Sequence, residues 1–154
     1  METVGLGFCF EDMPLRRRYR TVGRTVTEPD IVGFINTTGM TEVLFTNLDY
    51  LQNHTDFPAR LVPGAQVFAV AEGLVMTASI QETGVAFLGM DLNIEGPVFA
   101  NDTLHVEVEV IEARRTSKRP DRALVRTRNT VKKQDGKTVM VYTPLRMMKC
   151  RTTG

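Results

Sequence analysis

The feature that most constrains this chain is a long segment, residues 64–81, whose apolar side chains recur at helical spacing on nearly every face. Val67 and Leu74 belong to one apolar stripe, and further apolar residues fill the positions between. A helix of this kind is expected to be buried nearly all round. Small residues such as Ala69 and Gly73 would let a sheet approach it closely.

Fewer strands are expected before this helix than after it. One strand is predicted over residues 17–26. Thr27 is a suitable N-cap for a helix that follows, and Gly39 is a suitable end for it. A shorter helix is predicted over residues 47–53, followed by a proline-marked loop.

The part of the chain after the long helix is predicted to be strand. The four strands are expected over residues 85–94, 103–116, 122–133 and 138–150. Apolar and charged residues alternate in the second of them, which is typical of a half-buried strand. Ile111 breaks this alternation, and a β-bulge there would restore the phase.

This order of elements predicts the α+β class. About five antiparallel strands must wrap around the one apolar helix to bury it, an arrangement known as the hot-dog fold. The 154 residues suit a single domain over 1–154. Residues 61–80 include Pro63 and Glu72, so they favour a buried helix over a membrane span. Two widely separated cysteines suit a cytoplasmic protein without a metal site.

Charge is unevenly distributed along the chain. Residues 1–100 hold 6 Lys/Arg against 12 Asp/Glu, whereas residues 101–154 hold 13 against 6. A basic third can mark a surface for phosphate groups or nucleic acid, or a solvated strand face. Nucleic acid is the least favoured of these partners, because Trp is absent and no stacking platform accompanies the arginines.

Several short motifs together resemble the MaoC-like acyl dehydratases, a family that includes the (R)-specific enoyl-CoA hydratases. They run in the family's order from about Phe10 to Arg151. The matching segments are residues 10–12, 19–21, 23–31, 38–39, 49–51, 61–64, 96–98, 101–104, 115–119 and 134–137. The resemblance implies the same hot-dog fold.

The activity that the resemblance implies is reversible hydration of a trans-2-enoyl thioester of coenzyme A. An Asp and a His around one water act as general base and general acid in such enzymes. Their motif, Gly-Asp-x-x-x-x-His, begins at Gly39 here, so Met40 stands at the Asp position and Phe45 at the His position. Pro63-Gly64 stands where the family has His-Gly. Coenzyme A would enter as part of the substrate, with no separate cofactor.

Three readings of these replacements remain open. In the first, the chain is a catalytically silent hot-dog subunit that binds acyl-CoA, and Met40 and Phe45 line an apolar wall for the acyl chain or for the dimer interface. Pro63 and Gly64 are assigned to substrate binding as well. Some hydratases that resemble this family pair such a chain with a catalytic one. We expect a homodimer or a higher oligomer. A heteromer of the kind just described is the alternative.

In the second reading the catalytic groups have moved. Glu42 and His54 would supply an acid and a base, and Asn47 would orient a water. Each of these residues also has a plain structural interpretation, as a helix cap or a surface side chain.

In the third reading the chain is a hot-dog thioesterase. Such enzymes typically need a carboxylate on or near the central helix, and Glu72 is the acidic candidate there, unless it is paired with an arginine. In any of the three, Arg115, Lys118 and Arg119 could contact the phosphates of coenzyme A.

Overall fold

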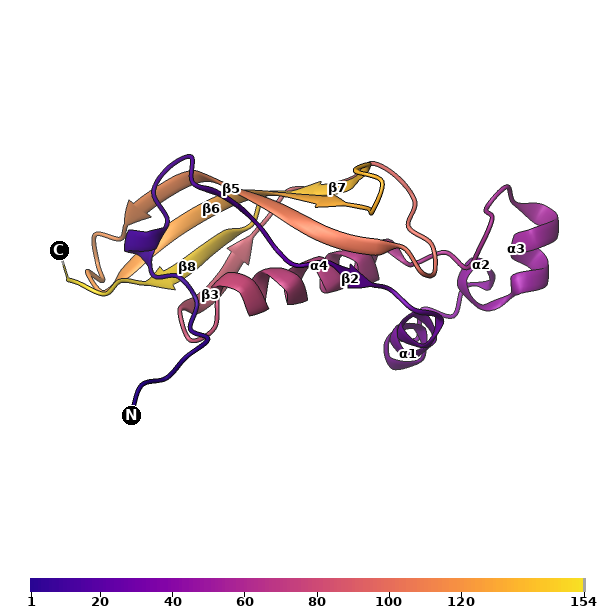
Figure 1. The fold of residues 1–154 in the computed structure, drawn as a ribbon, viewed down its shortest axis with the longest axis horizontal. Helices are drawn as coiled ribbons and strands as arrows, with labels where there is room; N and C mark the ends of the chain where they lie inside the picture. The colour runs from indigo at the N-terminus through magenta and orange to yellow at the C-terminus, as the bar shows by residue number, and fades with distance from the viewer. Residues whose placement is uncertain (154) are drawn as a thin grey trace.

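The computed structural model describes residues 1–153 and shows an antiparallel sheet curved around a long helix (Figure 1). The helices are η1 (Phe10–Asp12), α1 (Glu28–Thr38), α2 (Val43–Thr46), α3 (Leu48–His54) and α4 (Gly64–Ser79). The strands are β1 (Arg18–Arg20), β2 (Arg24–Thr25), β3 (Gly84–Gly89), β4 (Leu92–Ile94), β5 (Thr103–Arg115), β6 (Arg122–Lys132), β7 (Thr138–Tyr142) and β8 (Leu145–Lys149).

The eight strands occupy five positions across the sheet. β5 and β6 are long and pair with each other. β1 and β2 both pair with β5, and β7 and β8 both pair with β6. β4 and β3 continue outward from β7 and β8 and form the opposite edge. The predicted sheet of about five strands around a central helix is thus confirmed, with three of the five positions each filled by two short strands.

Local signals in the sequence account for several boundaries. Thr27 and Asp30 form a reciprocal capping box at the start of α1, with the Thr27 N–H 2.8 Å from Asp30 Oδ2. Gly39 ends α1 with a φ of 72°, a left-handed conformation that favours glycine. The register of β5 against β6 shifts between Val110 and Glu112, which confirms the predicted bulge at Ile111.

The core lies between the concave face of the sheet and two covering segments. α4 covers one part of that face, where Leu104, Val106 and Val131 are completely buried. The segment around η1 covers the rest, with Met13 packed over residues such as Val110. Each fully buried side chain of this size contributes about 1.5–3 kcal/mol to the free energy of unfolding. The N-terminal segment is therefore an integral part of the core.

One expectation about α4 is wrong. Ala65, Ala69, Gly73 and Met76 are exposed, so the helix is not buried nearly all round, and small residues expected against the sheet face away from it. The reason is that the sheet contacts one side of α4 and no other element of the described chain covers the opposite side (Figure 1). Within residues 1–153 no helix has both the length and the apolar character that a membrane crossing requires.

The convex face of the sheet carries much of the basic charge in paired form. Glu107 lies 3.1 Å from Lys132, and Glu109 lies 3.7 Å from Arg128. Glu109 and Arg128 face each other across β5 and β6, whereas Glu107 reaches Lys132 diagonally, two positions away from its direct partner Thr130. Because the positive charges there face carboxylates, this face is a mixed and solvated strand surface rather than a continuous basic patch.

Candidate functional site

The segment that carries the motif is held by the main core. Met40 follows the left-handed Gly39, and both Met40 and Phe45 are half-buried. Phe45 packs against the main core cluster. The Arg60 guanidinium fixes this segment, because its Nη1 donates to the Phe45 carbonyl over 2.8 Å and its Nε pairs with Glu28 at 2.5 Å. Met40 and Phe45, which the resemblance places at the Asp and His positions, are apolar side chains that cannot transfer a proton.

The three proposed substitutes have local structural roles. Glu42 caps α2 by accepting from the Leu44 N–H over 3.0 Å, and Asn47 caps α3 by accepting from the Tyr50 N–H over 2.9 Å. His54 is the last residue of α3 and stacks on the Tyr50 ring at 5.1 Å between centroids. In the described chain no hydrogen bond or ion pair joins any two of Glu42, Asn47 and His54. The assignment of a relocated acid and base to them stays a prediction.

Pro63 and Gly64 lie at the amino end of α4, beside an apolar groove of about 300 Å³. An added Cβ at Gly64 would come within 2.7 Å of the Ile94 side-chain terminus, so a larger residue would push into this groove. The first backbone N–H groups of α4 have no partner within the helix. The groove is lined by Phe57, Leu61, Val62, Gly64, Val67, Ile94, Gly96, Pro97, Val98, Val139 and Met140.

Farther along α4 a buried carboxylate meets two strands. Glu72 Oε1 accepts a hydrogen bond of 2.7 Å from the Tyr142 hydroxyl and lies 2.5 Å from Arg146 Nη2. Burial and the neighbouring Glu72 charge raise the pKa of Tyr142 well above its usual range. Beside Tyr142, Asn129 accepts from the Thr127 hydroxyl over 2.6 Å. We refer to Glu72, Tyr142 and Arg146 as the polar triad.

Sequence reasoning identified Glu72 and an arginine as its alternative partner, but it did not identify Arg146 or Tyr142. A signal for Arg146 was present, because this residue occupies the buried phase of β8 together with the apolar Met148. A polar residue in that phase needs a partner inside the protein. Which partner it has cannot be read from the alternation.

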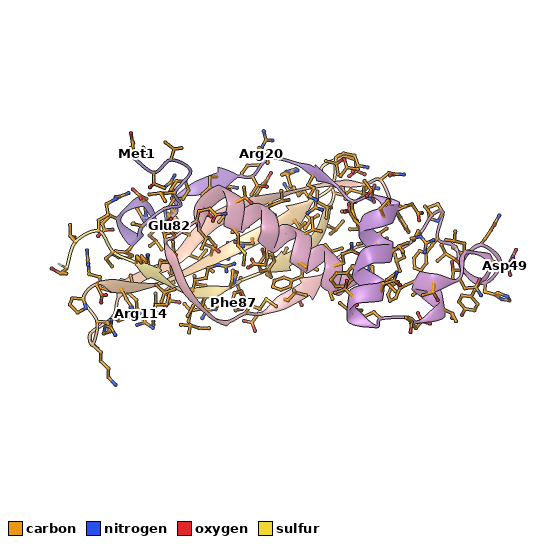
Figure 2. The ribbon with its side chains drawn as sticks, turned by 90° about the horizontal axis from the view of Figure 1, so that it is seen from below. Met1, Arg20, Asp49, Glu82, Phe87 and Arg114 are labelled. Atoms are coloured by element: carbon orange, nitrogen blue, oxygen red, sulfur yellow. The ribbon has the colours of Figure 1, made fainter. Side chains whose placement is uncertain are left out.

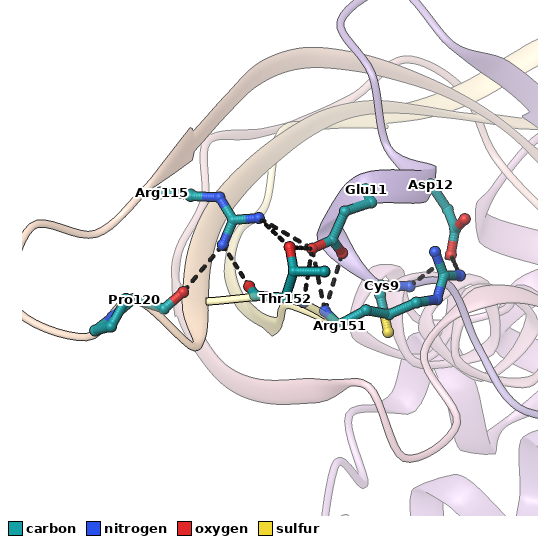
Figure 3. Close-up of polar contacts among 7 residues, drawn as sticks. All are labelled: Cys9, Glu11, Asp12, Arg115, Pro120, Arg151 and Thr152. Atoms are coloured by element: carbon teal, nitrogen blue, oxygen red, sulfur yellow. Dashed lines mark hydrogen bonds and ion pairs between the residues drawn. The ribbon is translucent and has the colours of Figure 1, made fainter. Parts of the chain in front are cut away.

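The three basic residues assigned to phosphate binding lie near the turn between β5 and β6. Arg115 is engaged inside the chain, where it bonds to Glu11, Thr152 and the Pro120 carbonyl (Figure 3). Burial tends to raise the pKa of Glu11, but hydrogen bonds from the Arg151 and Thr152 backbone outweigh that effect and lower it to about 2.

The remaining basic side chains of this turn are more exposed. Arg119 lies 3.4 Å from Asp121, and Lys118 has no ion pair among the described residues. Figure 2 shows Arg114, just before the turn, and Asp49 of α3 at opposite ends of the molecule. In one protomer, therefore, the basic turn and the motif segment do not form one site.

The described residues contain no group of three or more His, Cys, Asp or Glu side chains placed to hold a metal ion. What these residues offer is an apolar groove at the amino end of α4, a buried polar triad along the helix, and a basic turn at the far end.

The family profile described as "MaoC like domain" matches residues 11–134 of this chain. No curated protein sequence matches it. Many solved structures are similar to it, and three are described here. The first is a conserved hypothetical protein from Mycobacterium tuberculosis with a double hot-dog fold (TM-score 0.86, 22% identity), and the comparison covers 97% of this chain and 46% of that one.

The second is an R-hydratase from Pseudomonas aeruginosa (TM-score 0.74, 23% identity), with 95% of this chain and 88% of that one covered. The third is the HadBC complex, a 3R-hydroxyacyl-ACP dehydratase from Mycobacterium tuberculosis (TM-score 0.69, 17% identity), with 86% and 96% covered. These similarities establish a shared fold.

Proposed function

Because the chain belongs to the MaoC-like domain family, whose dehydratase and hydratase members act through an Asp and a His, we propose that it binds an acyl thioester of coenzyme A without performing the family's hydration chemistry. The observation that supports the proposal is that Met40 and Phe45 stand at the two positions where the resemblance implies the proton-transferring Asp and His. Each general acid or base contributes roughly 10² to 10⁴ in rate, so a hydratase that lacks both would be close to inert.

The acyl group is assigned to the apolar groove beside Gly64. The lining of this groove is almost entirely hydrocarbon, and a volume of about 300 Å³ lies at the lower end of the range typical of small-ligand pockets. The N–H groups at the start of α4 lie at the same end of the helix and can donate to a thioester carbonyl.

We propose that a second copy of the chain completes the ligand site. All six residues of β3 are exposed, and in the described chain β3 pairs with β8 alone. Val85, Phe87 and Leu88 make this open edge apolar. An exposed apolar edge strand is a ready site for pairing with another strand, so we propose that two copies join through β3 into one continuous sheet.

Such a dimer would also bring opposite ends of its two copies close together. A twofold axis at β3 makes the two copies of α4 antiparallel, which brings the amino end of one α4 toward the basic turn of the other copy. Lys118 and Arg119 of one copy could then contact the phosphates of a coenzyme A whose acyl group lies in the other. The heteromeric alternative replaces one copy with a hot-dog chain that carries the Asp and His.

The thioesterase reading is less well supported. Glu72 shares one oxygen between Tyr142 and Arg146, and a carboxylate held in this way is neutralised and hydrogen-bonded rather than free to attack a thioester. Nucleic-acid binding is not supported either, because the arginines of the basic third mostly face carboxylates.

Two measurements on the purified chain test the proposal. Crotonyl-CoA hydration, followed by absorbance, is expected to be undetectable, while calorimetry with hexanoyl-CoA is expected to show saturable binding. Turnover comparable to that of an (R)-hydratase would overturn the first expectation. If turnover appears and either Glu42→Gln or His54→Ala abolishes it, the acid and base have moved to these residues.

A pair of glycine variants locates the ligand. Gly64→Leu is expected to weaken hexanoyl-CoA binding at least tenfold, because the added side chain enters the groove. Gly73→Ala is the matched control, since an added Cβ there meets no atom within 4 Å on the exposed face of the same helix. Equal affinities in the two variants would place the acyl group elsewhere.

A further inference from the structure

The two cysteines lie near opposite ends of the sequence but at the same end of the fold. Cys9 directly precedes η1 and Cys150 directly follows β8, and both elements lie at the end of the sheet away from α2 and α3 (Figure 1). Both residues are half-buried and both thiols are free. Neither residue belongs to the open edge formed by β3, and the proposed ligand site uses neither thiol.

Two carboxylates hold the cysteine segments against each other (Figure 3). Asp12 Oδ2 accepts from the Cys9 N–H over 3.0 Å and also pairs with the guanidinium of Arg151. Arg151 directly follows Cys150, and its backbone N–H donates to Glu11 over 3.1 Å. One carboxylate oxygen therefore contacts both Cys9 and the residue next to Cys150.

A second set of hydrogen bonds ties both segments to the turn after α4. The Phe8 N–H donates to the Ser79 carbonyl over 2.8 Å, and the Lys149 N–H donates to the Thr83 carbonyl over 2.9 Å. Ser79 and Thr83 belong to one turn, where the Thr83 hydroxyl donates to the Ser79 carbonyl over 3.5 Å. Each cysteine is thus next in sequence to a residue anchored on the same turn, which makes the two thiols neighbours in space.

The environment of the two thiols gives them different chemical roles. Burial raises the pKa of the Cys150 thiol, and the nearby Glu11, Asp121 and Cys9 groups raise it further, while Arg115 acts in the opposite direction. Because the thiolate is the nucleophile in disulfide exchange, a raised pKa makes Cys150 a poor first nucleophile. Cys9 is therefore assigned the first attack on an oxidant, and Cys150 the second.

We propose that Cys9 and Cys150 form a reversible disulfide when the protein meets a small disulfide such as oxidised glutathione. The Cys9 thiolate attacks one sulfur of the oxidant, and a first glutathione leaves. The Cys150 thiolate then attacks the Cys9 sulfur of the mixed disulfide, and the second glutathione leaves. Two protein thiols are oxidised, and their protons and electrons reduce one glutathione disulfide to two thiols. In a reducing compartment the pair returns to free thiols.

This disulfide fastens the segment that covers the second part of the core. Met13 is only 2% exposed and packs over Val110, but the ion pairs that join its segment to the C-terminal end lie near the surface. Exposed ion pairs contribute little to stability. A disulfide that closes a loop of nearly the whole chain restricts the unfolded state strongly, so it is expected to raise the melting temperature.

Glutathione buffers of stepwise composition test the proposal on the intact chain. After equilibration, acid quenching and alkylation, peptide mapping by mass spectrometry is expected to find Cys9 joined to Cys150 within one chain. The matched control is Cys9→Ser with Glu2→Cys, which moves the first thiol to an exposed residue of the same segment. This control is expected to need about a tenfold or more higher ratio of [GSSG] to [GSH]² for half-oxidation. Equal ratios for the two proteins would overturn the inference, and so would glutathione adducts or links between chains as the main wild-type products.

Melting temperatures show whether the disulfide fits the native fold. Oxidised wild type is expected to melt at least about 5 °C above the reduced protein. Cys150→Ser, which cannot form the bond, should melt at the same temperature in the two buffers. A disulfide that forms without raising the melting temperature of the wild type would show that the fold does not hold the thiols side by side, and the inference would fail.

Discussion

Near the amino end of α4, Met40 and Phe45 stand at the positions where the family resemblance implies an acid and a base, whereas farther along the same helix a carboxylate is buried against a tyrosine and an arginine. One region is apolar where the resemblance implies polar groups, and the other has polar groups where a core would be apolar. Family resemblance and buried polarity therefore point to different places in this molecule.

The largest effect is expected from Arg146→Met alone, which leaves Glu72 buried without its partner. Removing one member of a buried ion pair typically lowers the free energy of unfolding by about 3–5 kcal/mol. The double variant with Glu72→Gln should recover most of this loss. Urea unfolding of the three proteins measures both effects. If Arg146→Met alone is as stable as the wild type, the buried polar triad contributes no more to the free energy of unfolding than the apolar region near the amino end of α4.

Tyr142→Phe tests the neutral member of the triad. It removes the 2.7 Å hydrogen bond to Glu72 while keeping the buried ring, and should lower the free energy of unfolding by about 1.5–3 kcal/mol. The matched control is Tyr50→Phe in α3, where the residue is exposed and its hydroxyl makes no hydrogen bond within residues 1–153. Equal losses in the two variants would contradict the assignment.

Asn47 tests the region near the amino end of α4, because this residue can be interpreted either as a helix cap or as part of the ligand site. As a helix cap, Asn47→Ala should cost about 1 kcal/mol, and Asn47→Asp should restore stability, since Asp caps helices equally well. Neither change should alter affinity for hexanoyl-CoA. A loss of binding in both variants without a loss of stability would instead place Asn47 at the ligand.

The smallest effect concerns the pH dependence of the contact between Glu11 and the C-terminal segment. The pKa of Glu11 is lowered from 4.5 to about 2 in the folded chain, so its stabilising contribution is complete above pH 4.5 and is lost as the pH falls toward 2. The difference in melting temperature between wild type and Glu11→Gln should therefore shrink over this interval. A difference that stays constant from pH 6 to pH 2 would exclude this linkage.

Much of the fold could be predicted because it depends on residues close together in the chain. The capping box at Thr27, the left-handed Gly39 and the bulge at Ile111 each follow from a few neighbouring residues. The Asn47 cap of α3 was predicted in the same way. The four-residue α2 was not predicted, although a helix cap was one interpretation of Glu42, because so short a segment shows no helical periodicity.

The candidate site could be predicted only in part. The motif positions were found by resemblance, but the role of Arg115 depends on Glu11, 104 residues away in sequence. Arg60, which holds Phe45 in place, carries no signal in its own segment. The apolar pattern of residues 64–81 predicted a helix correctly but not which of its faces the sheet would cover.

By itself the sequence determined the α+β order of elements, the period of each one and the apolar character of Met40 and Phe45, because these depend on residue types and local spacing. Only the tertiary structure decided that Glu72 meets Tyr142 and Arg146, which lie 70 and 74 residues away, and that one face of α4 stays open. Chain folding brings such groups together, and a pattern along one strand or helix contains no information about the element that packs across from it.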